Sequence, residues 1–150
     1  MKLPDKDEWE EAWTGLDEAC AFKNFFGKTL QEALELFQTH ALYYQEDLVY
    51  MPEKPFRYYF RAYTHYLWSD KSRGDSDGAS CYLSLIRIRL DDHPDWLDST
   101  WPDVERVLQK LATNQEFYDA SPGIYGSFSK KVDRVLAKRT KAQQGESLKP

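Results

Sequence analysis

Residues 29–37 read Thr-Leu-Gln-Glu-Ala-Leu-Glu-Leu-Phe, and this stretch decides the fold. Thr29 followed three residues later by Glu32 is the pattern of a capping box, in which each side chain bonds the other residue's backbone N–H at a helix start. Apolar side chains then recur at the i, i+3, i+4, i+7 spacing of one helix face: Leu30, Ala33, Leu34 and Phe37. The stretch therefore predicts an amphipathic helix that begins near residue 29.

The residues before this stretch predict another helix. Asp5 can cap its start, its first turn is acidic, and Gly27 suits its end, although Gly15 weakens its middle. Its expected core face consists of apolar side chains at helical spacing: Trp9, Ala12, Trp13, Leu16 and Cys20.

After residue 44 the helical pattern is interrupted. Two prolines and mixed polarity predict a turn or loop over residues 45–55, with Leu48, Val49 and Met51 pointing inward. A third helix is expected over 56–68, with aromatic side chains on both faces. One face carries Phe56, Tyr59, Phe60, Tyr63 and Leu67, and the other carries Arg57, Tyr58, Arg61, His65 and Trp68. Such a helix is either packed on two sides or offers aromatic surface to a partner.

The second half of the sequence predicts three further helices. Turn-forming residues at 70–78 precede a helix that is expected to begin at about Ala79 and to end at residues 91–94. Residues 86–90 alternate between apolar and polar side chains as a strand would, but a helix is the preferred interpretation. Thr100 with Pro102 opens the next, and Ser121 with Pro122 opens the last. Their expected inward side chains are Val104, Val107, Leu108 and Leu111, then Ile124, Phe128, Val132 and Val135.

Together these segments predict an all-α protein: a compact single-domain bundle of five or six amphipathic helices over residues 1–141, with a flexible tail at 142–150. Of 150 residues, 41% are hydrophobic and 30% charged, which is typical of globular chains. No apolar run is long enough for a membrane span, and the acidic N-terminus does not resemble a signal peptide. A cytoplasmic protein with reduced cysteines is therefore expected.

The sequence predicts no cofactor, metal or catalytic site. Asp75 and Asp77 lie in a stretch that fails the register of a calcium loop, which favours helix capping. The three histidines are too far apart to share a helix face, and a nucleophilic Cys81 is disfavoured inside an apolar run. The common nucleotide-binding and hydrolase motifs are absent.

Charge is unevenly distributed along the chain. The net charge is −5 over residues 1–22, zero over 23–72, −5 over 73–129 and +5 over 130–150. A basic stripe is expected on the last helix, formed by Lys130, Lys131, Arg134, Lys138 and Lys141. The preferred interpretation is complementation of the helix dipole, and a phosphate contact is the alternative.

Aromatic residues give the leading functional hypothesis, because ten of the chain's 23 fall between residues 43 and 68. Mixed with acids, they suit a non-enzymatic interaction protein that binds a basic protein partner, by physical analogy with toxin-neutralising immunity proteins. The candidate contact residues are Tyr43, Tyr44, Glu46, Asp47, Tyr58 and Trp68. The alternatives are a small enzyme or ligand-binding protein whose tyrosine-lined pocket is closed by His65 or His93, and, less favoured, a nucleic-acid binder with a basic tail.

Overall fold

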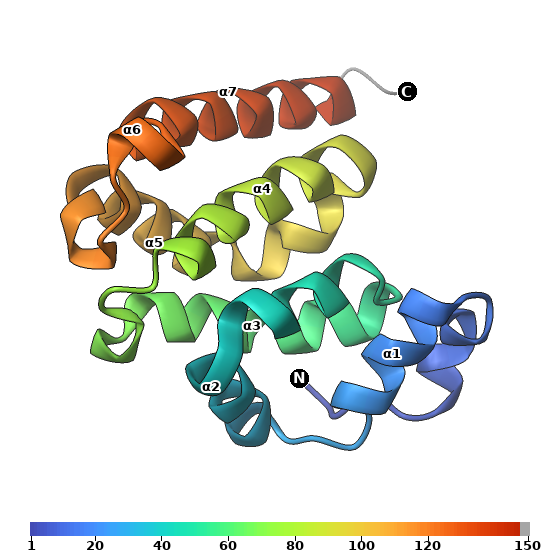
Figure 1. Ribbon diagram of the computed structural model, residues 1–150. Coiled ribbons are helices and arrows are strands. Elements are labelled where there is room, and N and C mark those ends of the chain that lie inside the picture. The colour runs from blue at the N-terminus through green and yellow to red at the C-terminus, as the bar shows by residue number, and fades with distance from the viewer. Residues whose placement is uncertain (148–150) are drawn as a thin grey trace. The chain divides into compact units, whose positions relative to one another are not determined.

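The computed structural model describes the backbone of residues 1–147 and the side chains of residues 1–10 and 14–145. Within this part of the chain the fold is all-α, with 82% of residues in α- or 3-10 helix and no strand (Figure 1). The chain divides into two compact units, Met1–Ser72 (unit 1) and Arg73–Pro150 (unit 2). The predicted fold class is confirmed.

The helices of each unit follow one another with short connections. Unit 1 contains η1 (Asp7–Trp13), α1 (Leu16–Phe25), α2 (Leu30–Val49), α3 (Glu53–Trp68) and η2 (Asp70–Ser72), where η denotes a 3-10 helix. Unit 2 contains α4 (Ser76–Asp92), η3 (Pro94–Thr100), α5 (Trp101–Thr113), η4 (Gln115–Tyr118), α6 (Pro122–Tyr125) and α7 (Phe128–Ser147). None of the helices in the described residues combines the length and apolar character that crossing a bilayer requires.

Helix α2 begins as predicted. The backbone N–H of Glu32 donates to Thr29 Oγ1 at 3.2 Å, and the N–H of Thr29 donates to Glu32 Oε1 at 2.9 Å, which completes the capping box. Ala33 and Phe37 are fully buried. The loop predicted over 45–55 is wrong in extent, because α2 continues to Val49 and only residues 50–52 connect it to α3.

The two prolines explain this difference. Pro52 is the N-cap of α3 and Pro55 lies in its first turn, where a missing N–H breaks no helical hydrogen bond. The prolines therefore mark a helix start rather than a long loop. Leu48 and Met51 are buried, as expected, and Val49 is partly buried.

Helix α3 forms the core of unit 1. Ten of its sixteen residues are buried, among them Tyr59 and Tyr63. The ring of Tyr63 stacks on Phe37 of α2 with centroids 5.0 Å apart. Helix α3 also packs against η1, so the two-sided packing interpretation is the correct one for most of its length.

The first predicted helix is interrupted. Gly15 stands as the N-cap between η1 and α1, so the spacing counted from Trp9 does not carry across it. Trp9 is fully buried, but Leu16 is 92% exposed and Cys20 is exposed, so placing these two in the core was wrong. The side chains of Ala12 and Trp13 lie outside the described residues. Gly27 follows α1 with φ of 78°, in the left-handed region that favours glycine.

In unit 2, α7 packs against both α4 and α5. Residues 86–90 lie inside α4, so helix is correct and the strand is not formed. Helix α4 begins at Ser76, three residues earlier than expected, and the Oδ1 atom of its N-cap Asp75 accepts from the Gly78 N–H at 2.9 Å. All four predicted core residues of α5 are fully buried.

The last predicted helix is two helices. Gly126, with φ of 76°, separates the four-residue α6 from α7. Ile124 belongs to α6 and is 80% exposed, so its predicted inward orientation was wrong, whereas Phe128, Val132 and Val135 are buried as expected. Helix α7 runs through Ser147, beyond the start of the predicted tail.

Candidate functional site

The second half of α2 carries most of the predicted contact residues, and a break at His40 sets its direction. His40 has φ of −160° and ψ of 75°, which are not helical. Its Nδ1 accepts a hydrogen bond from the backbone N–H of Tyr43 at 3.3 Å. This is the geometry of an N-cap, so residues 41–49 begin a new helical segment.

Tyr43 is an exposed ring attached to the aromatic core. Its side chain is 51% exposed and meets Tyr44 edge-on, with centroids 4.9 Å apart. Tyr44 in turn meets Phe25 of α1 edge-on at 6.1 Å, and Phe25 contacts Tyr59 of α3 at 5.1 Å. These ring contacts with α1 and α3 restrict the two tyrosine side chains, so little side-chain entropy would be lost when a partner binds.

Two carboxylates, those of Glu46 and Asp47, follow these tyrosines in α2, and a third, that of Asp17 in α1, lies near enough to Asp47 to act on its charge. Glu46 is exposed, whereas Asp47 is only 8% exposed and accepts a hydrogen bond from Asn24 Nδ2 of α1 at 2.8 Å. Burial raises the pKa of Asp47 above its ordinary value, and the negative charges of Glu46 and of Asp17 in α1 raise it further against the opposing hydrogen bond. The negative charges of Glu46 and Asp17 therefore act unfavourably on the ionised Asp47 carboxylate.

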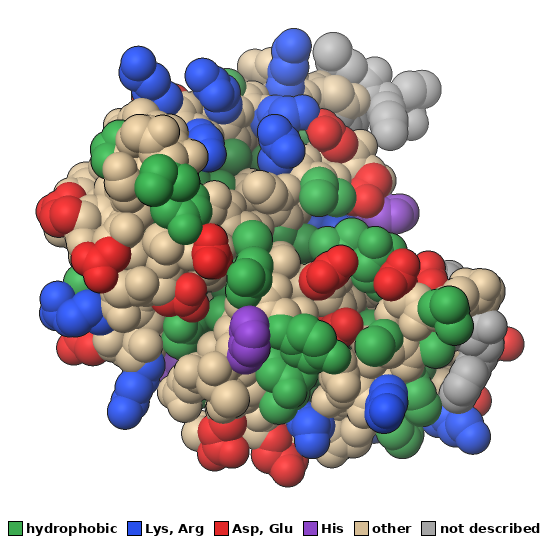
Figure 2. Space-filling view, in the orientation of Figure 1, with side chains coloured by type: hydrophobic (Ala, Val, Ile, Leu, Met, Phe, Trp, Pro, Cys, Tyr) green, Lys and Arg blue, Asp and Glu red, His purple; other side chains and the backbone are tan. Residues whose placement is uncertain are grey.

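We call this surface the acidic aromatic face and define it by Asp17, Tyr43, Tyr44, Glu46 and Asp47. Figure 2 shows hydrophobic side chains, with acidic ones among them, gathered over α1 and α2 on the visible side of unit 1. Sequence reasoning missed Asp17 and the hydrogen-bonding Asn24. They precede Glu46 and Asp47 by more than twenty residues, and only the packing of α1 against α2 brings them near these residues.

The structure does not join Tyr58 and Trp68 to this face. Tyr58 is buried, with its ring edge-on to Tyr59 at 4.9 Å and covered by the Arg61 guanidinium at 5.0 Å. Trp68 is 48% exposed and is the last residue of α3. It therefore stands at the opposite end of α3 from residues 50–52, which join α3 to the second half of α2.

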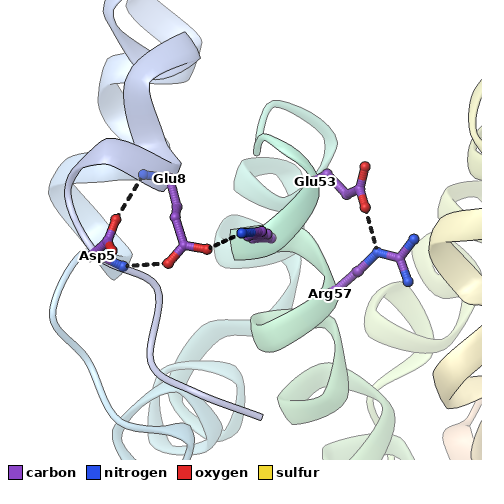
Figure 3. Close-up of polar contacts among 5 residues, drawn as sticks. Asp5, Glu8, Glu53 and Arg57 are labelled. Atoms are coloured by element: carbon purple, nitrogen blue, oxygen red, sulfur yellow. Dashed lines mark hydrogen bonds and ion pairs between the residues drawn. The ribbon is translucent and has the colours of Figure 1, made fainter.

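A hollow in unit 1 lies where η1 meets α3. It has a volume of about 680 Å³ and is lined by Met1, Lys2, Asp5, Asp7, Glu8, Lys54 and Arg57. Asp5 and Glu8 cap each other's backbone N–H groups at 3.0 and 3.1 Å, which confirms Asp5 as a cap, and Glu8 also pairs with Lys54 of α3 at 3.1 Å (Figure 3). The hydrogen bond from the Asp5 N–H, and then Lys54, lower the pKa of Glu8.

These hydrogen bonds and ion pairs hold η1 against α3, so the residues around the hollow have a structural role. Its lining holds three cations and three carboxylates, and Arg57 pairs with Glu53 at 3.0 Å (Figure 3). Because opposite charges balance, the lining favours neither a cationic nor an anionic ligand.

The other sequence candidates occupy structural positions. Among the described residues no three His, Cys, Asp or Glu side chains gather as a metal site would require. Asp75 caps α4, and Asp77 accepts a hydrogen bond from the Tyr125 hydroxyl at 2.9 Å. Tyr59 and Tyr63 are fully buried, so their rings have no surface open to a ligand. His93 caps the end of α4 and stacks on Trp96 at 4.0 Å.

Comparison with protein-family models, curated proteins and solved structures gives no match to this chain.

Proposed function

We propose that this protein is a non-enzymatic interaction protein whose acidic aromatic face binds a basic segment of a protein partner. The observation that carries the proposal is the half-exposed ring of Tyr43 one helical turn from Glu46 and Asp47, where burial and then the charges of Glu46 and Asp17 disfavour the ionised Asp47 carboxylate. A cation placed near these carboxylates offsets this unfavourable interaction. An exposed tyrosine next to it offers a π face to the same cation.

The charge of unit 1 supports the choice of a basic partner. Unit 1 holds 13 acidic and eight basic residues, whereas unit 2 holds 12 of each, so the chain's net charge of −5 belongs to unit 1. A net negative surface attracts basic partners and accelerates their approach at low salt.

The roles of the contact residues differ in this proposal. Tyr43 and Tyr44 anchor the partner, and Glu46 with Asp17 steers it. Asp47 contributes mainly through its charge and makes little direct contact with the partner, because it is buried and accepts a hydrogen bond from Asn24. Tyr58 supports the core beneath and has little surface to offer. Trp68 is a separate second contact, to be tested on its own.

The experiment is affinity purification from the native host with mass spectrometry, using three baits. These are the wild-type chain, the double variant Tyr43→Ala/Glu46→Gln, and the control double variant Ile124→Ala/Glu105→Gln. The control also removes one exposed apolar side chain and one exposed carboxylate, but from unit 2. We expect basic proteins captured by the wild type and the control to be lost from the Tyr43/Glu46 variant. Capture that is equal with all three baits contradicts the proposal.

Association and dissociation rates measured with a captured partner distinguish the electrostatic effect of the carboxylates from the contact made by the tyrosine ring. Raising salt from low to physiological strength should slow association far more than dissociation, because exposed charges are screened over about 8–10 Å. Tyr43→Ala should mainly speed dissociation, by about 30-fold if Tyr43 contributes on the order of 2 kcal/mol. Trp68→Ala is measured in the same way, and unchanged rates would remove Trp68 from the interface.

A further inference from the structure

Unit 2 contains a groove where α4 packs against α7. Its volume is about 160 Å³. It is lined by Leu83, Ser84 and Arg87 of α4 and by Lys131, Arg134, Val135 and Lys138 of α7. Figure 2 shows Lys and Arg side chains gathered over α7. Part of the predicted basic stripe thus meets an arginine from a second helix, which the sequence pattern alone did not show.

The cations of the groove differ in their existing partners. Lys138 pairs with Asp91, and Lys131 Nζ donates to the Tyr125 carbonyl at 2.5 Å, which fixes its position while leaving its charge unmatched. Within the described part of the chain, the exposed guanidinium groups of Arg87 and Arg134 have neither an ion pair nor a hydrogen bond. Three positive charges therefore remain without a matching carboxylate around a small cavity.

The groove is amphipathic. Leu83 and Val135 are almost completely buried and form its apolar part. The Ser84 hydroxyl adds a polar group at the edge. A ligand that fits therefore carries a compact, strongly negative group and a small apolar body.

We propose that this groove binds a phosphate monoester, with the phosphate between Arg87 and Arg134 and the apolar body over Leu83 and Val135. Guanidinium groups bind phosphate oxygens through pairs of N–H donors. A phosphate monoester carries a charge of about −1.5 to −2 at pH 7, so it matches several cations where a carboxylate matches one. The groove lining contains no aromatic ring on which a base could stack, which disfavours single-stranded nucleic acid.

The test is isothermal titration of the full chain at pH 7.5 with three probes. Phenyl phosphate carries both the phosphate and an apolar ring, inorganic phosphate lacks the ring, and benzoate carries the ring with a single charge. We expect saturable 1:1 binding of phenyl phosphate and at least tenfold weaker binding of the other two. Benzoate binding as tight as phenyl phosphate, or no saturable binding of phenyl phosphate, overturns the proposal.

Matched double variants distinguish the groove from general charge. Arg87→Gln/Arg134→Gln should weaken phenyl phosphate binding at least tenfold. Lys130→Gln/Lys141→Gln removes the same charge from exposed positions of α7 outside the groove, and should change binding less than twofold. Equal losses in both variants would show binding to net charge only and refute the site. All four positions are exposed, so far-UV circular dichroism should match the wild type.

Nucleic acid is the competing ligand. An oligothymidylate that binds more tightly than phenyl phosphate, displaces it, and loses its affinity in Arg87→Gln/Arg134→Gln would replace the proposed ligand with a nucleic acid. Proposed binding at the acidic aromatic face is independent of these outcomes, because it involves residues of unit 1 only.

Discussion

The hydroxyl of Tyr59 in α3 lies 2.8 Å from the backbone carbonyl oxygen of Phe25, the last residue of α1, and 2.7 Å from that of Lys28. One phenolic proton therefore serves two carbonyl groups in the segment that joins α1 to α2. Burial is the main cause that raises the pKa of this phenol, so it remains a donor at every pH at which the protein is handled.

Tyr59→Phe should reduce the free energy of unfolding by about 1–3 kcal/mol, because it removes the side-chain donor of the Lys28 carbonyl and one of the two donors of the buried Phe25 carbonyl. Urea denaturation followed by circular dichroism measures this change. Tyr43→Phe is the matched control. It removes the same atom from a half-exposed ring and should leave the free energy within about 0.5 kcal/mol of the wild type. Equal effects of the two variants would show that the Tyr59 hydroxyl is not specifically needed.

Asp47 should make the protein less stable as pH rises. Its folded-state pKa is raised, so the folded state holds this proton more tightly than the unfolded state, and the free energy of unfolding falls from about pH 4 upward through the raised pKa. Asp47→Asn keeps an oxygen to accept from Asn24 and removes the charge. We expect the variant to be at least as stable as the wild type at pH 7.

Denaturation curves at several pH values check this, and Glu46→Gln provides the comparison. Removing the neighbouring charge should weaken the pH dependence without abolishing it, because burial is the larger cause. If Asp47→Asn is markedly less stable than the wild type at pH 7, the carboxylate stabilises the fold and our assignment of its charge as unfavourable is wrong.

Thr29→Ala should destabilise the protein by about 1 kcal/mol, because it removes half of the capping box of α2. Thr39→Ala makes the same substitution within the exposed part of the same helix. There the threonine hydroxyl donates to the Glu35 carbonyl, and alanine is the better helix former, so stability should stay equal or rise slightly. Melting temperatures that fall equally would contradict the capping role.

Gln115→Glu should destabilise the protein by about 2–4 kcal/mol at pH 7. The Gln115 amide donates to the carbonyls of Ala120 and Gly126, both at 2.8 Å, while its oxygen accepts from the Phe128 N–H at 2.9 Å. A carboxylate would face two carbonyl oxygens without a proton. The loss should shrink as pH falls and the carboxyl group protonates.

The control for Gln115→Glu is Gln109→Glu on the exposed side of α5, which should show neither the loss nor its pH dependence. Thermal denaturation between pH 4 and pH 8 measures both variants. A loss that stays constant across this range would mean that shape rather than charge is responsible.

The sequence was sufficient to predict a helix and its core residues where the helix has its own cap and a single apolar face. The Thr29–Glu32 box and the four core residues of α5 are examples, because local hydrogen bonding and periodicity decide them. It was insufficient where a glycine interrupts the chain. At Gly15 and Gly126 the helical phase restarts, so residues counted across the break, such as Leu16 and Ile124, were assigned to the wrong side.

The candidate site was harder to predict, because exposure depends on distant packing. Helix α3 carries aromatic rings all round, so periodicity cannot show that Tyr58 is covered while Trp68 is half exposed. Glu46 and Asp47 are neighbours with the same chemistry. Asp47 is the buried one, and its partner Asn24, 23 residues earlier, is brought to it by the packing of α1 against α2.

The break at His40 affects how the chain can tolerate insertions. In a continuous helix, one inserted residue turns everything beyond it by about 100° relative to everything before it. Because the helical segment after His40 starts from its own cap, an extra residue between the Thr29 box and His40 could be absorbed at the break, leaving the orientation of Tyr43 unchanged. An insertion between Tyr43 and Asp47 has no such break, so it would rotate ring and carboxylate apart. The orientation of Tyr43 therefore does not depend on the length of the first half of α2, which the buried Ala33 and Phe37 constrain instead, whereas the length of the second half sets Tyr43 against Asp47.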